Sequence, residues 1–171
     1  MIKIVGYGSG NIEAIANIYR WLNIPCEIAR NEADLESATK VILPGVGAFD
    51  RSMELLNQSG MRRRLDRLVL EGGAPVLGIC VGMQMMASRG NEGNAQGLGW
   101  IEGRAIELDT SCLKAKPKLP HMGWNSVKPT EPHRLFEDID CTKGFYFLHS
   151  YHFVCADAAN VLAISTYGEE F

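Results

Sequence analysis

The sequence predicts an α/β fold in which a flavodoxin-like parallel or mixed sheet is flanked by helices and extended by a β-rich second half. Short apolar runs alternate with helical patterns over residues 1–90, which is typical of βαβ units and a parallel sheet. Segments rich in β-branched and aromatic residues, separated by turns, make up the remainder. No repeat, linker or low-complexity segment interrupts the 171 residues, so we expect a single domain over residues 1–171.

The first strand and helix follow from hydrophobic periodicity. Residues 2–6, IKIVG, form a short apolar run that ends in glycine, which predicts a strand. In residues 11–22, Ile15 and Tyr19 belong to an apolar row with helical spacing, and Asn11 precedes that row as an N-cap. The chain therefore begins with a strand followed by a helix.

The same alternation predicts the remaining elements. We expect strands at 26–29, 40–45 and 75–80, a short helix at 32–38, one or two helices at 49–73 and a helix at 81–90. The later β-rich segments are 97–108, 121–129, 144–155 and 160–168, with one short helix at 133–139. They predict an antiparallel or mixed extension of the sheet.

Charge and cysteine content exclude several classes of function. The formal net charge is −3 and the basic cluster at 61–68 contains Asp66, as in a solvated helix face, so we expect no nucleic-acid partner. No apolar run reaches the roughly 18 residues of a membrane span and no signal peptide follows Met1, so we expect a cytoplasmic protein without membrane contact. Five cysteines without paired C-x-x-C spacing argue against disulfides and zinc, and no metal or organic cofactor is implied.

The stretch GICVGMQ, residues 78–84, places Cys80 where a strand passes directly into a helix. This is the cysteine analogue of the G-x-S-x-G nucleophile elbow. A nucleophile on such a tight turn needs small neighbours, which Gly78 and Gly82 supply. The free N–H groups at the start of the following helix point toward the thiolate and offer an oxyanion donor. We therefore expect Cys80 to be a nucleophile.

A second strand is expected to end beside Cys80. The stretch PGVGAF, residues 44–49, closes the strand predicted at 40–45, and its glycines free the backbone to bend and to present amides to an anion. Reactive groups in open α/β sheets gather at the carboxyl ends of the strands. The two strand ends thus supply a nucleophile and a candidate oxyanion hole.

Four motifs, PGVGAFD, GICVGMQ, LPHMGWN and FYFLHSYHF, occur in this order along the chain. With their spacing they resemble the class I, or triad, glutamine amidotransferase family over residues 1–171. PHMGWN and HSY narrow the resemblance to the glutaminase subunits of imidazole glycerol phosphate synthases, which serve histidine biosynthesis.

The resemblance implies a reaction and a set of site residues. Cys80 would attack the side-chain amide of glutamine, form a glutamyl thioester and release ammonia to a partner, a (β/α)₈-barrel cyclase or synthase subunit in a heterodimer. The residues implied to bind glutamine are Gly45, Gly47, Gln84, His149, Ser150 and Tyr151. Those implied to form the oxyanion hole are Val46 and Gly47, after a peptide flip, and Val81, which gives a second amide. Those implied at or near the partner interface are His121, Trp124, Asn125 and Tyr146.

Two features depart from the family pattern. The family's catalytic histidine and glutamate belong to a C-terminal HPE-type motif that this sequence lacks, so we expect the chain to be truncated by about 30 residues. If the chain ends at Phe171, a noncatalytic subunit that regulates a synthase is the alternative. The family usually begins with DYG, whereas Gly6 replaces the aspartate here. This leaves open a paralogous subunit that aminates or amidinates sugars of surface polysaccharides.

Two further functions are disfavoured, each by the identity of one residue. GYGSGN, residues 6–11, resembles a dinucleotide-binding loop, but Asn11 stands where the third glycine is required, so a tight strand-to-helix turn is preferred. A related cysteine hydrolase would place a histidine directly after its nucleophile, where this chain has Val81.

Overall fold

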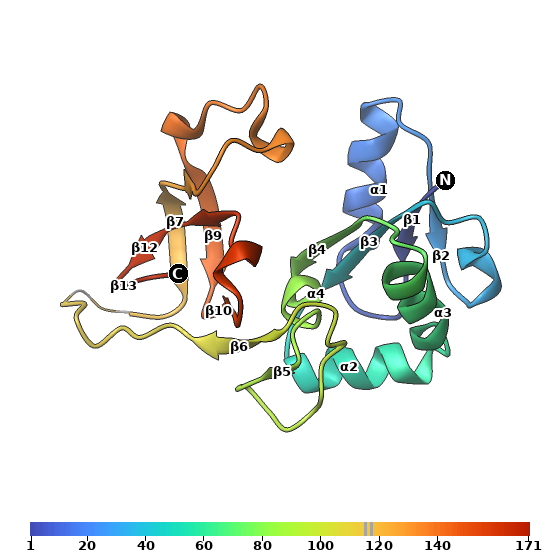
Figure 1. Ribbon diagram of the computed structural model, residues 1–171, viewed down its shortest axis with the longest axis horizontal. Helices are drawn as coiled ribbons and strands as arrows, with labels where there is room; N and C mark the ends of the chain where they lie inside the picture. The colour runs from blue at the N-terminus through green and yellow to red at the C-terminus, as the bar shows by residue number, and fades with distance from the viewer. Residues whose placement is uncertain (115, 117) are drawn as a thin grey trace.

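A parallel four-stranded sheet with helices on both faces forms the first half of the molecule (Figure 1). The structure is a computed structural model and describes residues 1–114, 116 and 118–171. The strands are β1 (Ile2–Val5), β2 (Cys26–Ala29), β3 (Lys40–Gly45) and β4 (Val76–Cys80). The helices are α1 (Ile12–Trp21), α2 (Phe49–Gln58), α3 (Arg62–Asp66) and α4 (Val81–Gln84), with the 3₁₀ turn η1 (Ala33–Leu35) and the π-helical turn η2 (Arg67–Glu71). The strand order is β2-β1-β3-β4 and every pairing is parallel, as the alternating pattern predicts.

The two faces of this sheet carry separate apolar layers. Successive strand residues point to opposite faces, so Ile4 and Val5 of β1 belong to different layers although both are fully buried. Val5 and Leu43 pack with α2 through Met53. Ile4 packs with α1 through Ala16. These two apolar layers hold the carboxyl ends of β3 and β4 in place.

The second half consists of small β-sheets in the described residues. Their strands are β5 (Arg89–Gly90), β6 (Gly103–Glu107), β7 (His121–Asn125), β8 (Lys128–Pro129), β9 (Phe145–His149), β10 (Tyr151–Cys155), β11 (Ala163–Ile164), β12 (Thr166–Tyr167) and β13 (Glu169–Glu170). They form the sheets β10-β6-β5, β7-β9, β8-β11 and β12-β13. The 3₁₀ turns of this half are η3 (Arg134–Phe136), η4 (Cys141–Lys143) and η5 (Ala158–Asn160). The predicted β-rich second half is thus present. The expected extension of the parallel sheet is wrong, because the described strands of this half pair with one another and none pairs with β1 to β4.

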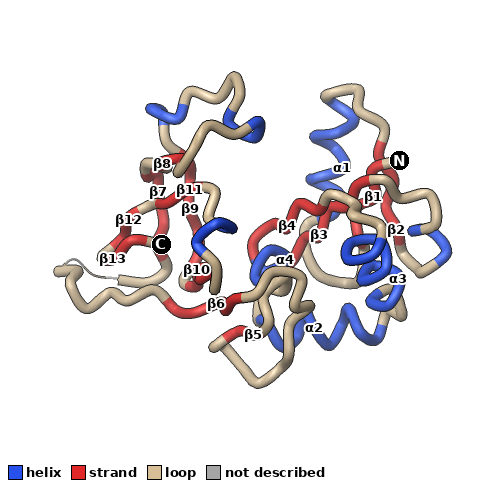
Figure 2. Tube along the Cα trace, in the orientation of Figure 1, coloured by secondary structure: helices blue, strands red, loops and turns tan. Residues whose placement is uncertain are grey.

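Strands β5 and β6 join the two halves. β5 follows α4 after a short turn and pairs in parallel with β6, which pairs antiparallel with β10. Figures 1 and 2 show β6 running from the helical half toward the C-terminal strands. Because β5 leaves so soon after α4, the second half is attached close to the strand end that carries Cys80.

Three of the predicted helices are shorter than expected. The helix expected over 81–90 ends at Gln84, because the Leu98 N–H donates to the Met85 carbonyl at 2.7 Å and β5 then pairs with β6. The helices expected at 32–38 and 133–139 are the single 3₁₀ turns η1 and η3. Tertiary pairing and turn chemistry override the local helical pattern here. Among the described residues, no helix has the length and apolar content needed to cross a bilayer.

Candidate active site

Cys80 lies at the turn from β4 into α4 in a backbone conformation that non-glycine residues seldom adopt. Its φ is 55° and its ψ is −122°, and the residue is exposed. Left-handed backbone at a non-glycine residue costs roughly 1–3 kcal/mol and persists only where the surroundings impose it. An exposed thiol on a strained strand-to-helix turn is the geometry of a nucleophile elbow.

Glycines around Cys80 let three backbone segments approach closely. A Cβ on Gly78 would lie 2.5 Å from a backbone atom of α4, and a Cβ on Gly82 would overlap the Leu43 carbonyl. Gly45 is the partner of Cys80 in the β3–β4 register, and a Cβ there would lie 2.5 Å from the Gly82 nitrogen. The first turn of α4 therefore sits directly on the end of β3, and a side chain at any of these glycines would displace it.

Cys80 opens into a cavity of about 560 Å³ whose walls come from both halves of the molecule. This volume lies within the usual range of small-molecule sites. The cavity contains three of the predicted glutamine-binding residues, Gln84, His149 and Tyr151. Ser150 lies between the last two, and its carbonyl accepts a hydrogen bond from the N–H of Leu108 at 2.9 Å. The structure thus brings the predicted nucleophile together with half of the predicted substrate-binding set.

A chain of hydrogen bonds fixes the wall around His149. His149 Nδ1 lies 2.9 Å from the Tyr151 carbonyl, so this nitrogen donates. Neutral His149 then accepts at Nε2 from His121 Nδ1, 3.0 Å away, and His121 Nε2 accepts from Asn125 Nδ2 at 3.2 Å. Asn125 also donates to the Thr166 carbonyl at 2.8 Å. With both ring nitrogens engaged, His149 positions the 149–151 backbone and has no nitrogen free to act as a base.

The same cluster requires an uncharged His121. Its ring stacks between Phe147 and Tyr167, with centroid distances of 4.8 and 4.1 Å. Burial, and secondarily the neighbouring His149, lower the pKa of His121 below its usual 6.5. A neutral ring can donate at one nitrogen and accept at the other, as this hydrogen-bond chain requires.

The oxyanion residues predicted from the sequence, Val46 and Gly47, follow the end of β3. The Val46 N–H donates to Ser9 Oγ at 3.0 Å, and the same hydroxyl donates to the Val46 carbonyl at 3.1 Å. Gly47 has a φ of +82°, and a Cβ there would meet nothing within 4 Å. Val81, the third predicted residue, begins α4 and is buried. The Val46 amide is therefore occupied by Ser9 in this structure.

Trp124 and Tyr146, predicted at a partner interface, lie side by side on the exposed face of the β7–β9 sheet. They are 72% and 57% exposed, and their ring centroids are 6.0 Å apart in an edge-to-face arrangement. The register places Met122 opposite Leu148 on the same face, and both are exposed. His121 is only 3% exposed and alternates onto the other face with Asn125, so these two support the exposed patch from behind. Contiguous exposed apolar residues of this kind mark interaction surfaces.

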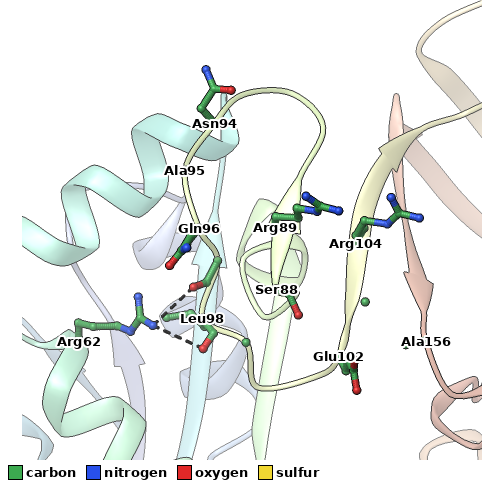
Figure 3. Close-up of a pocket in the computed structure, with 13 residues that line it drawn as sticks. Arg62, Ser88, Arg89, Asn94, Ala95, Gln96, Leu98, Glu102, Arg104 and Ala156 are labelled. Carbon is green, nitrogen blue, oxygen red and sulfur yellow. Dashed lines mark hydrogen bonds between the residues drawn. The ribbon is translucent and has the colours of Figure 1, made fainter.

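A larger, polar hollow lies beside β5 and β6, away from Cys80 (Figure 3). Its volume is about 810 Å³, and none of its lining residues borders the cavity at Cys80. Arg62 of α3 reaches it, donating through Nη2 to the carbonyls of Gly97 and Leu98 at 3.5 and 3.4 Å and through Nε to Asp66 at 2.8 Å. We interpret Arg62 as a structural residue that holds the loop against which α4 ends.

Three residues near the cavity were not singled out from the sequence. His152 lines it at 7% exposure, and within the described part of the chain neither ring nitrogen has a hydrogen-bond partner. Burial lowers its pKa, Glu169 at 3.6 Å opposes that shift, and His149 adds to it. Glu92 accepts from the Phe49 N–H at 2.8 Å. Single polar residues in β-rich or loop segments carry no periodic signal that would have revealed them.

Ser9 is the third residue that the sequence did not reveal. Together with Glu92 it reaches backbone N–H groups in the segment that follows β3, at Val46 and Phe49. Burial, then Glu107 and Glu92, raise the pKa of Tyr151. A sequence motif for these contacts does not exist, because the partners are backbone atoms far away along the chain. Within the described residues, no group of three or more His, Cys, Asp or Glu side chains could hold a metal ion.

Comparison with known proteins decides the family. The model of the family described as "Glutamine amidotransferase class-I" matches residues 3–171. The chain belongs to this family. It is 52% identical over 171 residues to the imidazole glycerol phosphate synthase subunit HisH of Bdellovibrio bacteriovorus and 42% identical to that of Leptospira borgpetersenii. Both alignments cover all of this chain and 84% of the relative's length.

Two solved structures share the fold. A crystal structure of a glutamine amidotransferase superposes with a TM-score of 0.69 at 17% identity, covering 98% of this chain and 85% of the other. The structure of PurLQS from Thermotoga maritima gives a TM-score of 0.64 at 17% identity, covering 98% of this chain and 76% of the other. At these identities the likeness establishes the fold alone. The α/β class and the family expected from the motifs are thus confirmed.

Proposed function

We propose that this class I glutamine amidotransferase is the glutaminase subunit of an imidazole glycerol phosphate synthase, acting in cytoplasmic histidine biosynthesis. The similarity to HisH subunits over all 171 residues of this chain supports the pathway. The observation that carries the chemistry is Cys80, an exposed residue with a φ of 55° that lines a cavity together with Gln84, His149 and Tyr151. A strained, presented nucleophile beside a cavity of substrate size supports acyl transfer from a small amide.

The reaction proceeds through a thioester. Cys80 Sγ forms a bond to the side-chain carbonyl carbon of glutamine, the C–N bond breaks, and the nitrogen leaves as ammonia. Water then hydrolyses the Cys80 thioester to release glutamate. The negative charge on the carbonyl oxygen would be stabilised by amides at Val46 or Gly47 and at Val81.

A base must carry the thiol proton to the departing nitrogen. Among the described residues, no side chain makes a hydrogen bond to Cys80 Sγ, and His149 has both nitrogens engaged. The sequence contains no HPE motif, to which the family resemblance assigns this role. The described residues therefore account for the nucleophile and the substrate cavity, whereas the base is assigned only by resemblance.

The ammonia would pass to a (β/α)₈-barrel cyclase subunit bound in a heterodimer. One exposed apolar face is best suited to bind this cyclase subunit, because four large apolar side chains gather there in register: Met122, Trp124, Tyr146 and Leu148. Tyr146 and Leu148 also line the cavity of Cys80, so this surface and the site of ammonia release adjoin.

Glutamate release by the full-length protein with its cyclase subunit tests the proposal. We expect Cys80→Ala to lower the rate at least about 10³-fold, since the variant cannot form the thioester. Cys112→Ala is the matched control, because Cys112 is also an exposed free cysteine but lies outside the cavity. It should keep the full rate.

Each contrary outcome points to a different error. Retained activity in Cys80→Ala would show that another group is the nucleophile. If the unaltered protein releases no glutamate even with the cyclase bound, the chain is a noncatalytic subunit. Activity that responds only to a different barrel subunit would favour the paralogous amidotransferases of polysaccharide synthesis.

A further inference from the structure

We propose that the polar hollow beside β5 and β6 is a binding site for a small phosphorylated sugar, whose phosphate group lies between Arg89 and Arg104. The residues that line this hollow do not border the cavity of Cys80, so the inference goes beyond the proposed function and does not depend on it. The volume of about 810 Å³ lies within the usual range of small-molecule sites.

Two arginines stand next to each other on the β5–β6 pairing. In the parallel register Arg89 of β5 is the neighbour of Arg104 of β6, and both residues are exposed. Figure 3 shows their side chains extending in the same direction from the two strands. Like charges on neighbouring strand positions repel each other and lower stability. An anion bound between the two guanidinium groups would replace this repulsion with attraction.

Neither arginine is neutralised from within the described part of the chain. Arg62, at another border of the hollow, pairs with Asp66 at 2.8 Å. The ion pairs of the described residues include neither Arg89 nor Arg104. Glu102 supplies the carboxylate of the described lining, and Figure 3 shows it pointing away from both guanidinium groups. Two positive charges are therefore left for a ligand.

The charge and the donors of this arginine pair match a phosphate group. A phosphate monoester carries a charge of about −1.5 to −2 near neutral pH and has three terminal oxygens that accept hydrogen bonds. Each guanidinium group can donate two parallel N–H bonds to such oxygens. A carboxylate has a single charge and two oxygens, so it would leave one of the arginines unneutralised. The pair therefore favours a phosphate over a carboxylate.

The rest of the lining suits hydroxyl groups on the same ligand. Ser88, Asn94 and Gln96 contribute a hydroxyl and two amides, and Glu102 contributes a carboxylate. The Ser88 N–H donates to the Gly103 carbonyl at 3.1 Å, which holds Ser88 beside β6. Hydroxyl and amide groups both donate and accept hydrogen bonds, and a carboxylate accepts them from sugar hydroxyls. This polar lining favours a sugar phosphate over inorganic phosphate.

The site lies where the two halves of the molecule join. Arg89 belongs to β5, which follows α4, and Arg104 belongs to β6, which pairs with β10. A phosphate that accepts from both arginines adds hydrogen bonds across the two-residue β5–β6 pairing. Binding should therefore stabilise the junction that attaches β10 to the half that carries Cys80.

Calorimetric titration of the full-length protein with glucose 6-phosphate tests the site. We expect binding that Arg89→Ala and Arg104→Ala each weaken roughly 10- to 100-fold, because each variant loses charge-assisted hydrogen bonds. Arg89→Lys keeps the charge but loses the planar fork, so its affinity should fall between those of Arg89→Ala and the unaltered protein. Arg63→Ala is the matched control, since Arg63 is also exposed but lies outside the hollow, and it should keep the full affinity.

Glucose and inorganic phosphate are the comparison ligands. Glucose should show no measurable binding, and inorganic phosphate should bind more weakly than glucose 6-phosphate. Failure of glucose 6-phosphate to bind, or equal affinities in Arg89→Ala, Arg104→Ala and Arg63→Ala, would overturn the proposal. Inorganic phosphate that binds as tightly as glucose 6-phosphate would overturn the assignment of a sugar. Thermal melting of each variant shows that it is folded, and Cys80→Ala should bind normally, so the site is tested separately from the proposed function.

Discussion

The two halves of the molecule are stabilised by different interactions. In the first half, buried aliphatic and aromatic side chains fill both faces of a parallel sheet. In the second half, the described buried side chains include His121, His152 and Ser165. The buried aliphatic residues Leu98, Ala105 and Leu108 lie before, on or next to β6, at the junction with the first half. The nucleophile therefore stands on an apolar scaffold, whereas the opposite wall of its cavity depends on polar and aromatic contacts.

The largest loss of stability should follow a substitution in the apolar core of the first half. Phe49 is 1% exposed at the start of α2 and packs against Gly90 of β5. Phe49→Ala should lower the free energy of unfolding by about 3–5 kcal/mol, because it removes a buried ring and leaves a cavity. Urea unfolding measures this loss. Leu148→Ala, at a 56% exposed position of the second half, is the comparison and should change stability by less than about 0.5 kcal/mol. Equal losses of stability in the two variants would contradict the claim that the first half depends more on apolar packing.

Acidification should cause a smaller loss of stability that is confined to the second half. The pKa values of His121 and His152 lie below the 6.5 of an unfolded histidine, with burial as the main cause in each. The unfolded state then binds more protons, so the stability that these neutral rings contribute is present above 6.5 and is lost as the pH falls through their folded values. Hydrogen exchange at about pH 7.5 and about pH 5.5, corrected for intrinsic rates, should show β7 and β9 losing protection while β1 and β3 keep it.

Substitution of single histidines sharpens this result. His121→Gln should reduce the acid-induced loss, because it removes a titrating ring from the hydrogen-bond chain. His133→Gln is the control, since that ring only caps the turn η3 through the Leu135 N–H. Uniform loss of protection across both halves would contradict the account.

The smallest effect on stability should come from the exposed face of β7 and β9. Trp124→Ala should change the free energy of unfolding by less than about 0.5 kcal/mol, yet weaken binding of the cyclase subunit about 10- to 100-fold. Trp21→Ala on α1 is the matched control, because Trp21 is 81% exposed on the other half of the molecule. Calorimetric titration measures both affinities. An unchanged affinity in Trp124→Ala, or an equal loss in both variants, would exclude this face as the interface.

The first half of the fold could be predicted because its signals are local. The strand at 40–45 coincides with β3 and the strand at 75–80 with β4 to within one residue, since each is a short apolar run bounded by Gly or Pro. The helix at 81–90 was too long, because contacts to residues 97–98 and pairing with β6 depend on distant residues. Short strands such as β12 and β13 exist only through their partners and have no sequence signal of their own.

The site could be predicted in part, because its nucleophile motif is also a local signal in the sequence. Cys80 and its glycines form one continuous motif, so the strained turn follows from the sequence. The clustering of Gln84, His149 and Tyr151 around one cavity came from family resemblance and not from spacing. Ser9 was missed because its partner is a backbone amide 37 residues away.

The central claim is that Cys80 is a presented nucleophile in a glutamine-binding cavity. Its most direct test is mass spectrometry of the full-length protein after treatment with a diazoketone analogue of glutamine, which alkylates a thiol held at the substrate carbonyl position. The account predicts one adduct, on Cys80, that excess glutamine prevents and that leaves exposed Cys112 unmodified. An unmodified Cys80, or labelling of Cys80 and Cys112 that is equal and insensitive to glutamine, would contradict it.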